Sequence, residues 1–181
     1  MSFSSERGIL TPMVLYATTH QVSDGITTEQ IIAPEHRDVD DPAVLAAECL
    51  ATVDAHLAEQ VRDGAVLIAG HDFGFGDHPE QAVLALQALG FVALICVSVA
   101  PTFAEAATNY GLPILISPEA SNALVPGHVA RLDLERGTIK PYQSDTIFEV
   151  SPCTPEMIAT VQRMQLLRRM RNVVEEEGFD G

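Results

Sequence analysis

Basic residues are scarce in this chain, and their scarcity limits what it can bind. Ten lysines and arginines stand against 25 aspartates and glutamates among 181 residues, which gives a formal net charge of −15. Nucleic acids and anionic membranes both need a basic surface, so neither is expected as a partner. A negative field suits a neutral or cationic ligand or a basic partner, although acidic residues also simply keep a protein in solution.

Long apolar runs, linkers and a signal-peptide pattern are also missing. No apolar run approaches the roughly 20 residues that span a bilayer, and the N-terminal segment 1–7 is polar. There are no repeats or low-complexity tracts, and 47% of the residues are apolar. We therefore expect a single globular domain over residues 1–181, cytoplasmic and free of the membrane.

Cysteine occurs three times, without the spacing of a metal or cluster site. Cys49 falls in a predicted helix, Cys96 in a predicted strand, and Cys153 stands apart from both. Reduced thiols of a cytosolic protein are the expectation. An iron–sulfur cluster held by this chain alone is not expected.

Apolar runs that alternate with helical periodicity predict an α/β fold with βαβ units and a parallel core sheet. The segment 17–40 is polar and predicts a loop, and the last third of the chain predicts antiparallel strands followed by a long helix. The expected strands are 9–16 (interrupted by Pro12), 65–69, 92–97, 113–116, 129–134, 138–142 and 146–150, and the expected helices are 42–61, 79–89, 101–110 and 154–177.

The most informative segment is the glycine-rich stretch 70–82, Gly-His-Asp-Phe-Gly-Phe-Gly-Asp-His-Pro-Glu-Gln-Ala. It joins a predicted buried strand to a segment of helical period. Pro79 suits the first turn of that helix, and Asp77 or His78 can cap it. Open α/β sheets place their sites at this end of the strands, so two titratable side chains stand at an expected site.

This stretch resembles the signature G-x-N-F-G-x-G-S-S-R-E-[HQ]-A of the aconitase swivel domain, found as the small subunit of isopropylmalate isomerase (3-isopropylmalate dehydratase) and homoaconitase. The resemblance covers about residues 24 to 140. It implies an aconitase swivelling-domain-like, three-layer β/β/α fold with a mostly parallel core sheet. Four further segments agree in the same order: 28–32 with T-D-Q-I-I, 41–42 with D-P, 63–70 with G-D-I-I-V-A-G, and 111–115 with G-L-P-x-L.

The chain departs from the family at the residues that carry its chemistry. Residues 77–79, Asp-His-Pro, replace the family's Ser-Ser-Arg, in which the first serine is the base and the arginine grips a substrate carboxylate. Pro101 and Glu105 replace both arginines of S-F-A-R-I-F-Y-R, and no Lys or Arg occurs between Arg62 and Arg131. Because a dicarboxylate normally needs a guanidinium fork, we expect a substrate other than isopropylmalate, citrate or homocitrate.

The resemblance assigns candidate roles to residues of this site. Asp77 stands where the family keeps its base, and a carboxylate in an apolar, water-excluded cleft becomes a stronger base. His78 is the alternative acid–base group, or it orients Asp77. In a purely structural role, Asp77 is a helix cap worth about 1 kcal/mol and His78 an exposed loop residue. The residues placed against the substrate are His36, Arg37, Gly74, Phe75, Gly76 and Ser98.

Neighbouring residues are expected to support the loop. Asp72 takes the place of the family's Asn and is expected to bond loop backbone, while Glu80 and Gln81 match the family and are expected to brace the loop. No metal site is expected in this chain. The alternative is a local cluster of His71, Asp72, Asp77 and His78 around a divalent metal.

The C-terminal helix carries an unusual concentration of basic residues. Arg163, Arg168, Arg169 and Arg171 make up nearly half of all Lys and Arg, and Glu175, Glu176 and Glu177 follow. Such a cluster either docks a partner or forms a solvated face with weak local ion pairs.

Two functions of different class follow from these observations. The first is the small subunit of a hydro-lyase in amino-acid or carboxylic-acid metabolism, inactive alone, which closes a site over a large subunit with a [4Fe-4S] cluster. The enzyme would dehydrate and rehydrate a hydroxy acid, and this substrate would differ from the family's usual ones. The second is a divergent, non-catalytic binding or regulatory paralogue. A stand-alone metal-dependent lyase using the His/Asp cluster is a third alternative.

Overall fold

Four neighbouring strands of the sheet run parallel to one another. β1 (Val14–Gln21), β2 (Ala65–Ile68), β3 (Phe91–Cys96) and β4 (Ile114–Ile116) lie in the order β4-β3-β2-β1, and all four residues of β2 are buried. This computed structural model describes residues 13–178. Continuous apolar sequence in β2 and β3 reflects burial on both faces, which is typical of parallel sheets.

Three antiparallel strands extend the same sheet beyond β1. β5 (Val129–Asp133) pairs with β1, β6 (Thr138–Pro141) pairs with β5, and β7 (Phe148–Glu149) pairs with β6. The tight turn between β5 and β6 places Gly137 at φ 74°, where a side chain is disfavoured. The predicted hairpin of the last third is confirmed.

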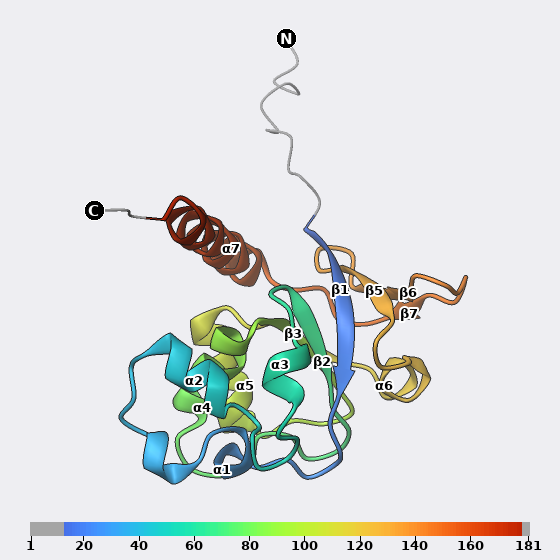
Figure 1. Cartoon of the computed structure of the whole chain (residues 1–181). Helices are drawn as coiled ribbons and strands as arrows, with labels where there is room; N and C mark the ends of the chain where they lie inside the picture. Colours follow the sequence, from blue (N-terminus) through green and yellow to red (C-terminus); the bar gives the residue numbers. More distant parts are fainter. Residues whose placement is uncertain (1–12, 179–181) are drawn as a thin grey trace.

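Helices cover the sheet on one side, and the antiparallel strands curl over the other (Figure 1). Leu67 and Leu94 pack among the first five helices, whereas Val66 and Ile95 pack with Leu132 and with the last two helices. The chain therefore has three layers, β/β/α, with a parallel core, and the expected fold class is confirmed. The helices are α1 (Thr28–Ile31), η1 (Pro34–His36, a 3-10 turn), α2 (Pro42–Glu48), α3 (Leu57–Gln60), α4 (Pro79–Leu89), α5 (Pro101–Tyr110), α6 (Pro118–Ala123) and α7 (Pro155–Glu176).

The first described strand differs from its prediction. Val14–Gln21 replaces the predicted 9–16, of which residues 9–12 lie outside the described part of the chain. The polar residue Thr19 is fully buried because its hydroxyl donates to the carbonyls of Val125 and His128, at 2.8 and 3.0 Å. Because these distant partners bond the Thr19 hydroxyl, β1 continues through a polar sequence to Gln21, inside the segment 17–40 that was predicted to be a loop.

The predicted helix 42–61 is also wrong, because it is broken in the middle. α2 ends at Glu48, and Leu50 adopts φ 56° while its side chain is fully buried. The backbone N–H of Leu50 donates to the carbonyl of Ile31 at 2.8 Å, so a contact with α1 holds this left-handed residue. The apolar stripe continues through the break into the short helix α3.

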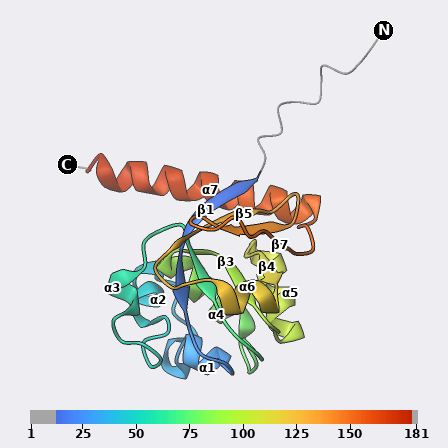
Figure 2. The ribbon, with the colours of Figure 1, turned by 90° about the vertical axis from the view of Figure 1, so that its right-hand side faces the viewer.

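The long helix α7 lies across the end of the sheet, and its C-terminal part extends past the other elements (Figure 2). Thr154, where the predicted helix starts, caps its N-terminus by accepting from the N–H of Met157. The Arg168 guanidinium joins α7 to the rest of the protein: it donates to the Asp63 carboxylate at 2.8 Å and to the carbonyls of Gln87 and Phe91. Arg168 is thus not part of a solvated face. Within residues 13–178, no helix has the length and apolar character to cross a bilayer.

Candidate active site

The glycine-rich loop lies where the parallel strands end, at the lower edge of the sheet in Figure 1. It leaves β2 after Ile68 and enters α4 at Pro79, between the segment 22–27 that follows β1 and the segment 97–100 that follows β3. Loops at the carboxyl ends of parallel strands form the usual binding crevice of such sheets. This position agrees with the sequence-based expectation.

The segment after β1 fixes the loop through backbone hydrogen bonds. The N–H of His71 donates to the Asp24 carboxylate at 2.8 Å, and the N–H of Gly74 donates to the carbonyl of Ile26 at 2.7 Å. A side chain at Gly70 would collide with the Asp24 carboxylate, so the loop needs glycine there. Sequence reasoning missed Asp24, because its contact joins residues far apart in the chain.

Thr28 and Glu29, at the start of α1, hold the backbone of Asp77. The Thr28 hydroxyl donates to the Asp77 carbonyl at 2.6 Å, and the Asp77 N–H donates to the Glu29 carboxylate at 3.2 Å. The N–H of Glu29 itself, followed by that of Asp77, lowers the pKa of the Glu29 carboxyl. The segment 28–32, which matches the family's T-D-Q-I-I, therefore has a physical role: it holds the backbone of Asp77.

Two glycines shape the tip of the loop. Gly74 (φ 83°) and Gly76 (φ 131°) adopt backbone conformations that side chains rarely reach. A Cβ on Gly74 would overlap the Phe103 ring, and one on Gly76 would overlap the Thr28 hydroxyl. Between them, Phe75 is 47% exposed at the tip. The roles expected for these residues in substrate binding remain predictions.

His78 adopts a left-handed conformation (φ 60°, ψ 52°) just before α4. It occupies the N-cap position, but its side chain makes no capping hydrogen bond. Neither Asp77 nor His78 therefore caps α4 with its side chain, but both side chains are exposed, as the structural alternative for His78 predicts. Histidine in this region is uncommon and costs energy, and strained residues of this kind gather at functional sites.

Arg37, Asp77 and His78 line one small pocket, of about 10 Å³, with Thr28 and Glu29. This is room for about one water molecule. Arg37 is exposed, and it is the one Lys or Arg that lines this pocket in the described part of the chain. The structure thus brings together the two predicted acid–base residues and the predicted cation, from segments about 40 residues apart along the chain. We call this the Arg37 pocket.

His36 lies outside the Arg37 pocket. Its imidazole is 3.5 Å from the Glu48 carboxylate on α2, so the two form an ion pair when His36 is protonated. The Gln81 amide donates to the carbonyls of His36 and Val39, at 3.1 and 2.8 Å. Gln81 therefore braces the segment 36–39, rather than the glycine-rich loop as expected, while Glu80 is exposed to solvent. The role of His36 in substrate binding stays a prediction.

Ser98 supports the loop from the neighbouring strand end. Its hydroxyl accepts the N–H of Asp72 at 2.8 Å and lies 3.5 Å from the Asp72 carboxylate. Asp72 thus contacts a side chain and not the loop backbone that was expected. Among residues 13–178, no three His, Cys, Asp or Glu side chains come close enough to hold a metal ion, so the His71–Asp72–Asp77–His78 cluster does not assemble as one group.

A three-layer β/β/α fold, with a glycine-rich loop bonded to a Thr-Glu-Gln segment at the carboxyl edge of parallel strands, defines a swivel domain of the aconitase type. A solved 3-isopropylmalate dehydratase structure from Methanocaldococcus jannaschii is similar to this chain, with a TM-score of 0.75 and 27% identity. The similarity covers 88% of this chain and 99% of that one.

Sequence relatives agree with this class. A 3-isopropylmalate dehydratase small subunit of Caldicellulosiruptor saccharolyticus is 31% identical over 169 residues, 93% of this chain and 97% of the relative. Another, from Caldanaerobacter subterraneus subsp. tengcongensis, is 35% identical over 138 residues, 76% and 85% of the two chains. No family model matches the chain. The chain belongs to the family of 3-isopropylmalate dehydratase small subunits.

Proposed function

We propose that this chain is the small subunit of a hydro-lyase that dehydrates and rehydrates a hydroxy acid, completing its active site with a larger, aconitase-like subunit. The similarity to small subunits over almost their whole length supports this role. The observation that carries the catalytic part is the Arg37 pocket, which Arg37, Asp77 and His78 line together at the sheet edge.

Asp77 is the group that we assign to proton transfer. Its backbone is held on both sides, by the Thr28 hydroxyl and the Glu29 carboxylate, so its position is fixed before any substrate arrives. His78 lines the same pocket and is the second acid–base group. Closure against a larger subunit would exclude water from this edge and strengthen Asp77 as a base.

The substrate is proposed to differ from isopropylmalate, citrate and homocitrate. Arg37 alone among the described lysines and arginines lines the pocket, and the acidic Glu29 lies beside it. One guanidinium grips one carboxylate, and a second carboxylate on this side would meet Asp77 and Glu29 as like charges. The substrate therefore presents at most one carboxylate to this subunit.

The [4Fe-4S] cluster that the family implies would belong to the larger subunit. Cys49 and Cys96 are fully buried, Cys153 is half-buried, and burial raises the pKa of Cys49 and raises that of Cys96 to about 12, which disfavours the thiolate that binds iron. The residues described here therefore do not fit a cluster. Bound in the partner, the cluster would supply a Lewis acid for the substrate hydroxyl.

The test is an activity assay of the assembled enzyme with a panel of hydroxy acids that carry one, two or three carboxylates. Asp77→Asn is expected to lower kcat at least about a hundredfold, as removal of a general base typically does, and Arg37→Gln to raise KM. Glu80→Gln is the control, since Glu80 is exposed and outside the Arg37 pocket. An enzyme whose activity is indifferent to Asp77→Asn and to His78→Asn would refute this site.

A non-catalytic binding or regulatory subunit is the second candidate. The absence of Lys and Arg between Arg62 and Arg131, together with the replaced Ser-Ser-Arg, favours it. An intact complex that binds hydroxy acids without converting any of them would support this role. A stand-alone metal-dependent lyase would instead show chelator-sensitive activity of the isolated chain, and it is the less favoured because the four His and Asp side chains do not assemble.

A further inference from the structure

The second half of α7 carries an apolar stripe that the described chain does not cover. Met157, Ile158 and Val161, in the first half, are buried in the core. Beyond them the helix extends past the sheet in Figures 1 and 2. The apolar side chains there are more than half exposed: Leu166 (58%), Leu167 (54%), Met170 (57%), Val173 (51%) and Val174 (65%).

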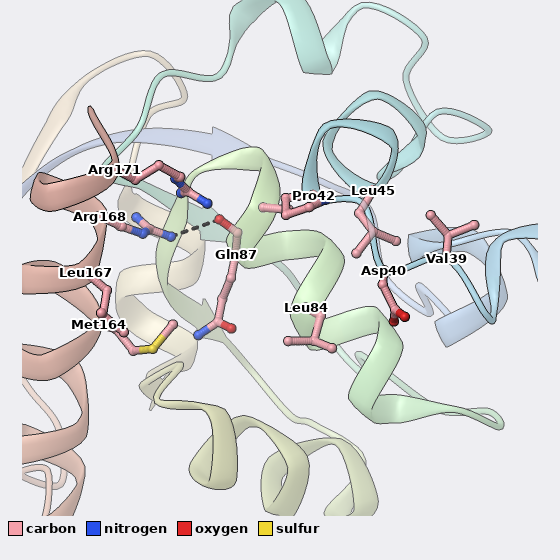
Figure 3. Close-up of a pocket in the computed structure, with 11 residues that line it drawn as sticks. Val39, Asp40, Pro42, Leu45, Leu84, Gln87, Met164, Leu167, Arg168 and Arg171 are labelled. Carbon is pink, nitrogen blue, oxygen red and sulfur yellow. Dashed lines mark hydrogen bonds between the residues drawn. The ribbon is translucent and has the colours of Figure 1, made fainter. Parts of the chain in front are cut away.

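These side chains recur at three- and four-residue spacing, so they form one continuous stripe on the helix. Met164, Arg168 and Arg171 lie on another side of α7 and line a groove of about 400 Å³ against α2 and α4 (Figure 3). Leu167 lines the edge of that groove. The body of the protein therefore occupies a neighbouring side of the helix and leaves the stripe open.

A charge of opposite sign stands at each end of the stripe. Arg163 lies two turns before Met170 and Glu177 two turns after it, so both lie in line with the apolar side chains. Both are exposed. A second copy of α7 laid antiparallel over the stripe would place unlike charges together at both ends, whereas a parallel copy would place like charges together.

We propose that this stripe, from Arg163 to Glu177, pairs with the same stripe of a second copy of this chain, antiparallel about a two-fold axis at Met170. An interface of this kind is isologous, so one self-complementary surface suffices. The proposal depends on α7 alone and stands whether or not the proposed reaction does. The facing pairs are Met170 with Met170, Leu166 with Val174, Leu167 with Val173, and Arg163 with Glu177.

The interface is small. The stripe is about 20 Å long at about 1.5 Å per residue, which places it at the low end of specific protein contacts. We therefore expect reversible association with a dissociation constant in the micromolar range, on the order of 10 µM. Sedimentation velocity of the full chain, from about 1 to about 300 µM, spans that range.

Sedimentation of two variants isolates the stripe. Met170→Glu is expected to raise the dimer dissociation constant at least about tenfold, because it places two carboxylates at the centre of an apolar contact. The matched control is Ile147→Glu, since Ile147 is also 57% exposed but belongs to the segment just before β7 and not to α7. A chain that stays monomeric at every concentration, or a dimer insensitive to Met170→Glu, would overturn the proposal.

The register is tested by charge exchange and by cross-linking. Arg163→Glu and Glu177→Arg are each expected to weaken the dimer, and the double exchange to restore it. Met170→Cys is expected to form an intermolecular disulfide on mild oxidation, whereas Asn172→Cys, which is exposed and lies about 200° from Met170 around the helix, is not. Association of this surface with a larger subunit alone, and never with a second copy, would contradict the choice of partner.

Discussion

At the scale of single residues, the site depends on backbone positions that other side chains enforce. Asp24, Thr28 and Glu29 all bond the loop that presents Asp77 and His78. The turns of that loop can be predicted from the sequence alone, because the pattern of Gly74 and Gly76 is local. The contacts that Asp24 and Glu29 make with the loop cannot be predicted in this way, because they join segments nearly 50 residues apart.

Glu29 gives the loop a pH dependence. Hydrogen bonds to its ionised form lower the pKa of Glu29 below its ordinary value of 4.5, so the unfolded chain binds the proton more readily. The stabilisation is fully present above about pH 4.5 and is lost as the pH falls through the lower, folded value. A carbon-13 NMR titration of the Glu29 carboxyl is expected to show a midpoint below 4.5. A midpoint at or above 4.5 would show that neither the N–H of Glu29 itself nor that of Asp77 stabilises the ionised carboxylate.

Two substitutions of His78 test whether stability depends on its backbone conformation or on its side chain. Glycine accepts its left-handed conformation, so His78→Gly is expected to keep the free energy of unfolding within about 0.5 kcal/mol of wild type. His78→Val is expected to lose about 1–3 kcal/mol, because a β-branched residue is strained there. Urea unfolding measures both. Equal loss in the two variants would mean that the side chain, and not the backbone angle, is what stability requires.

At the scale of helices and strands, the sequence predicts best the elements with local end signals. α4 and α5 each begin at a proline and end before a glycine, and both match the prediction at residues 79–89 and 101–110. The break after α2 was not predictable, since the left-handed Leu50 is held by the carbonyl of Ile31. Strand β1 similarly depends on distant partners for Thr19.

Arg168 is the residue that joins α7 to the body. Its side chain is 12% exposed and bonds the Asp63 carboxylate and the carbonyls of Gln87 and Phe91. Arg168→Met keeps the aliphatic stem and leaves these acceptors unpaired, so a loss of about 1–3 kcal/mol is expected. Hydrogen exchange is expected to accelerate in α7 before β2 or β3.

The control for this change is Arg169→Met, because Arg169 is exposed on the same helix. Its effect on the free energy of unfolding is expected to stay within about 0.5 kcal/mol. Equal effects of the two substitutions would mean that Arg168 contributes only a surface charge.

At the scale of the whole molecule, the chain combines the fold of its family with a glycine-rich loop that departs from the family signature at residues 77–79. The three-layer fold and the similarity over 93% of the chain agree with a dehydratase small subunit. Residues 77–79 are Asp-His-Pro, where the signature that the loop resembles has Ser-Ser-Arg, and this difference underlies the proposal of an altered substrate. The sequence predicts the location of the site at the sheet edge, and the fold brings Arg37 to it.

We propose that this chain works as one subunit of a hydro-lyase. The most direct measurement is anaerobic affinity purification of the chain from its native cells, with identification of co-eluting proteins and assay of iron and sulfide. We expect a stoichiometric larger subunit with about four irons and matching sulfide. Recovery of the chain without a larger subunit and free of iron would contradict it.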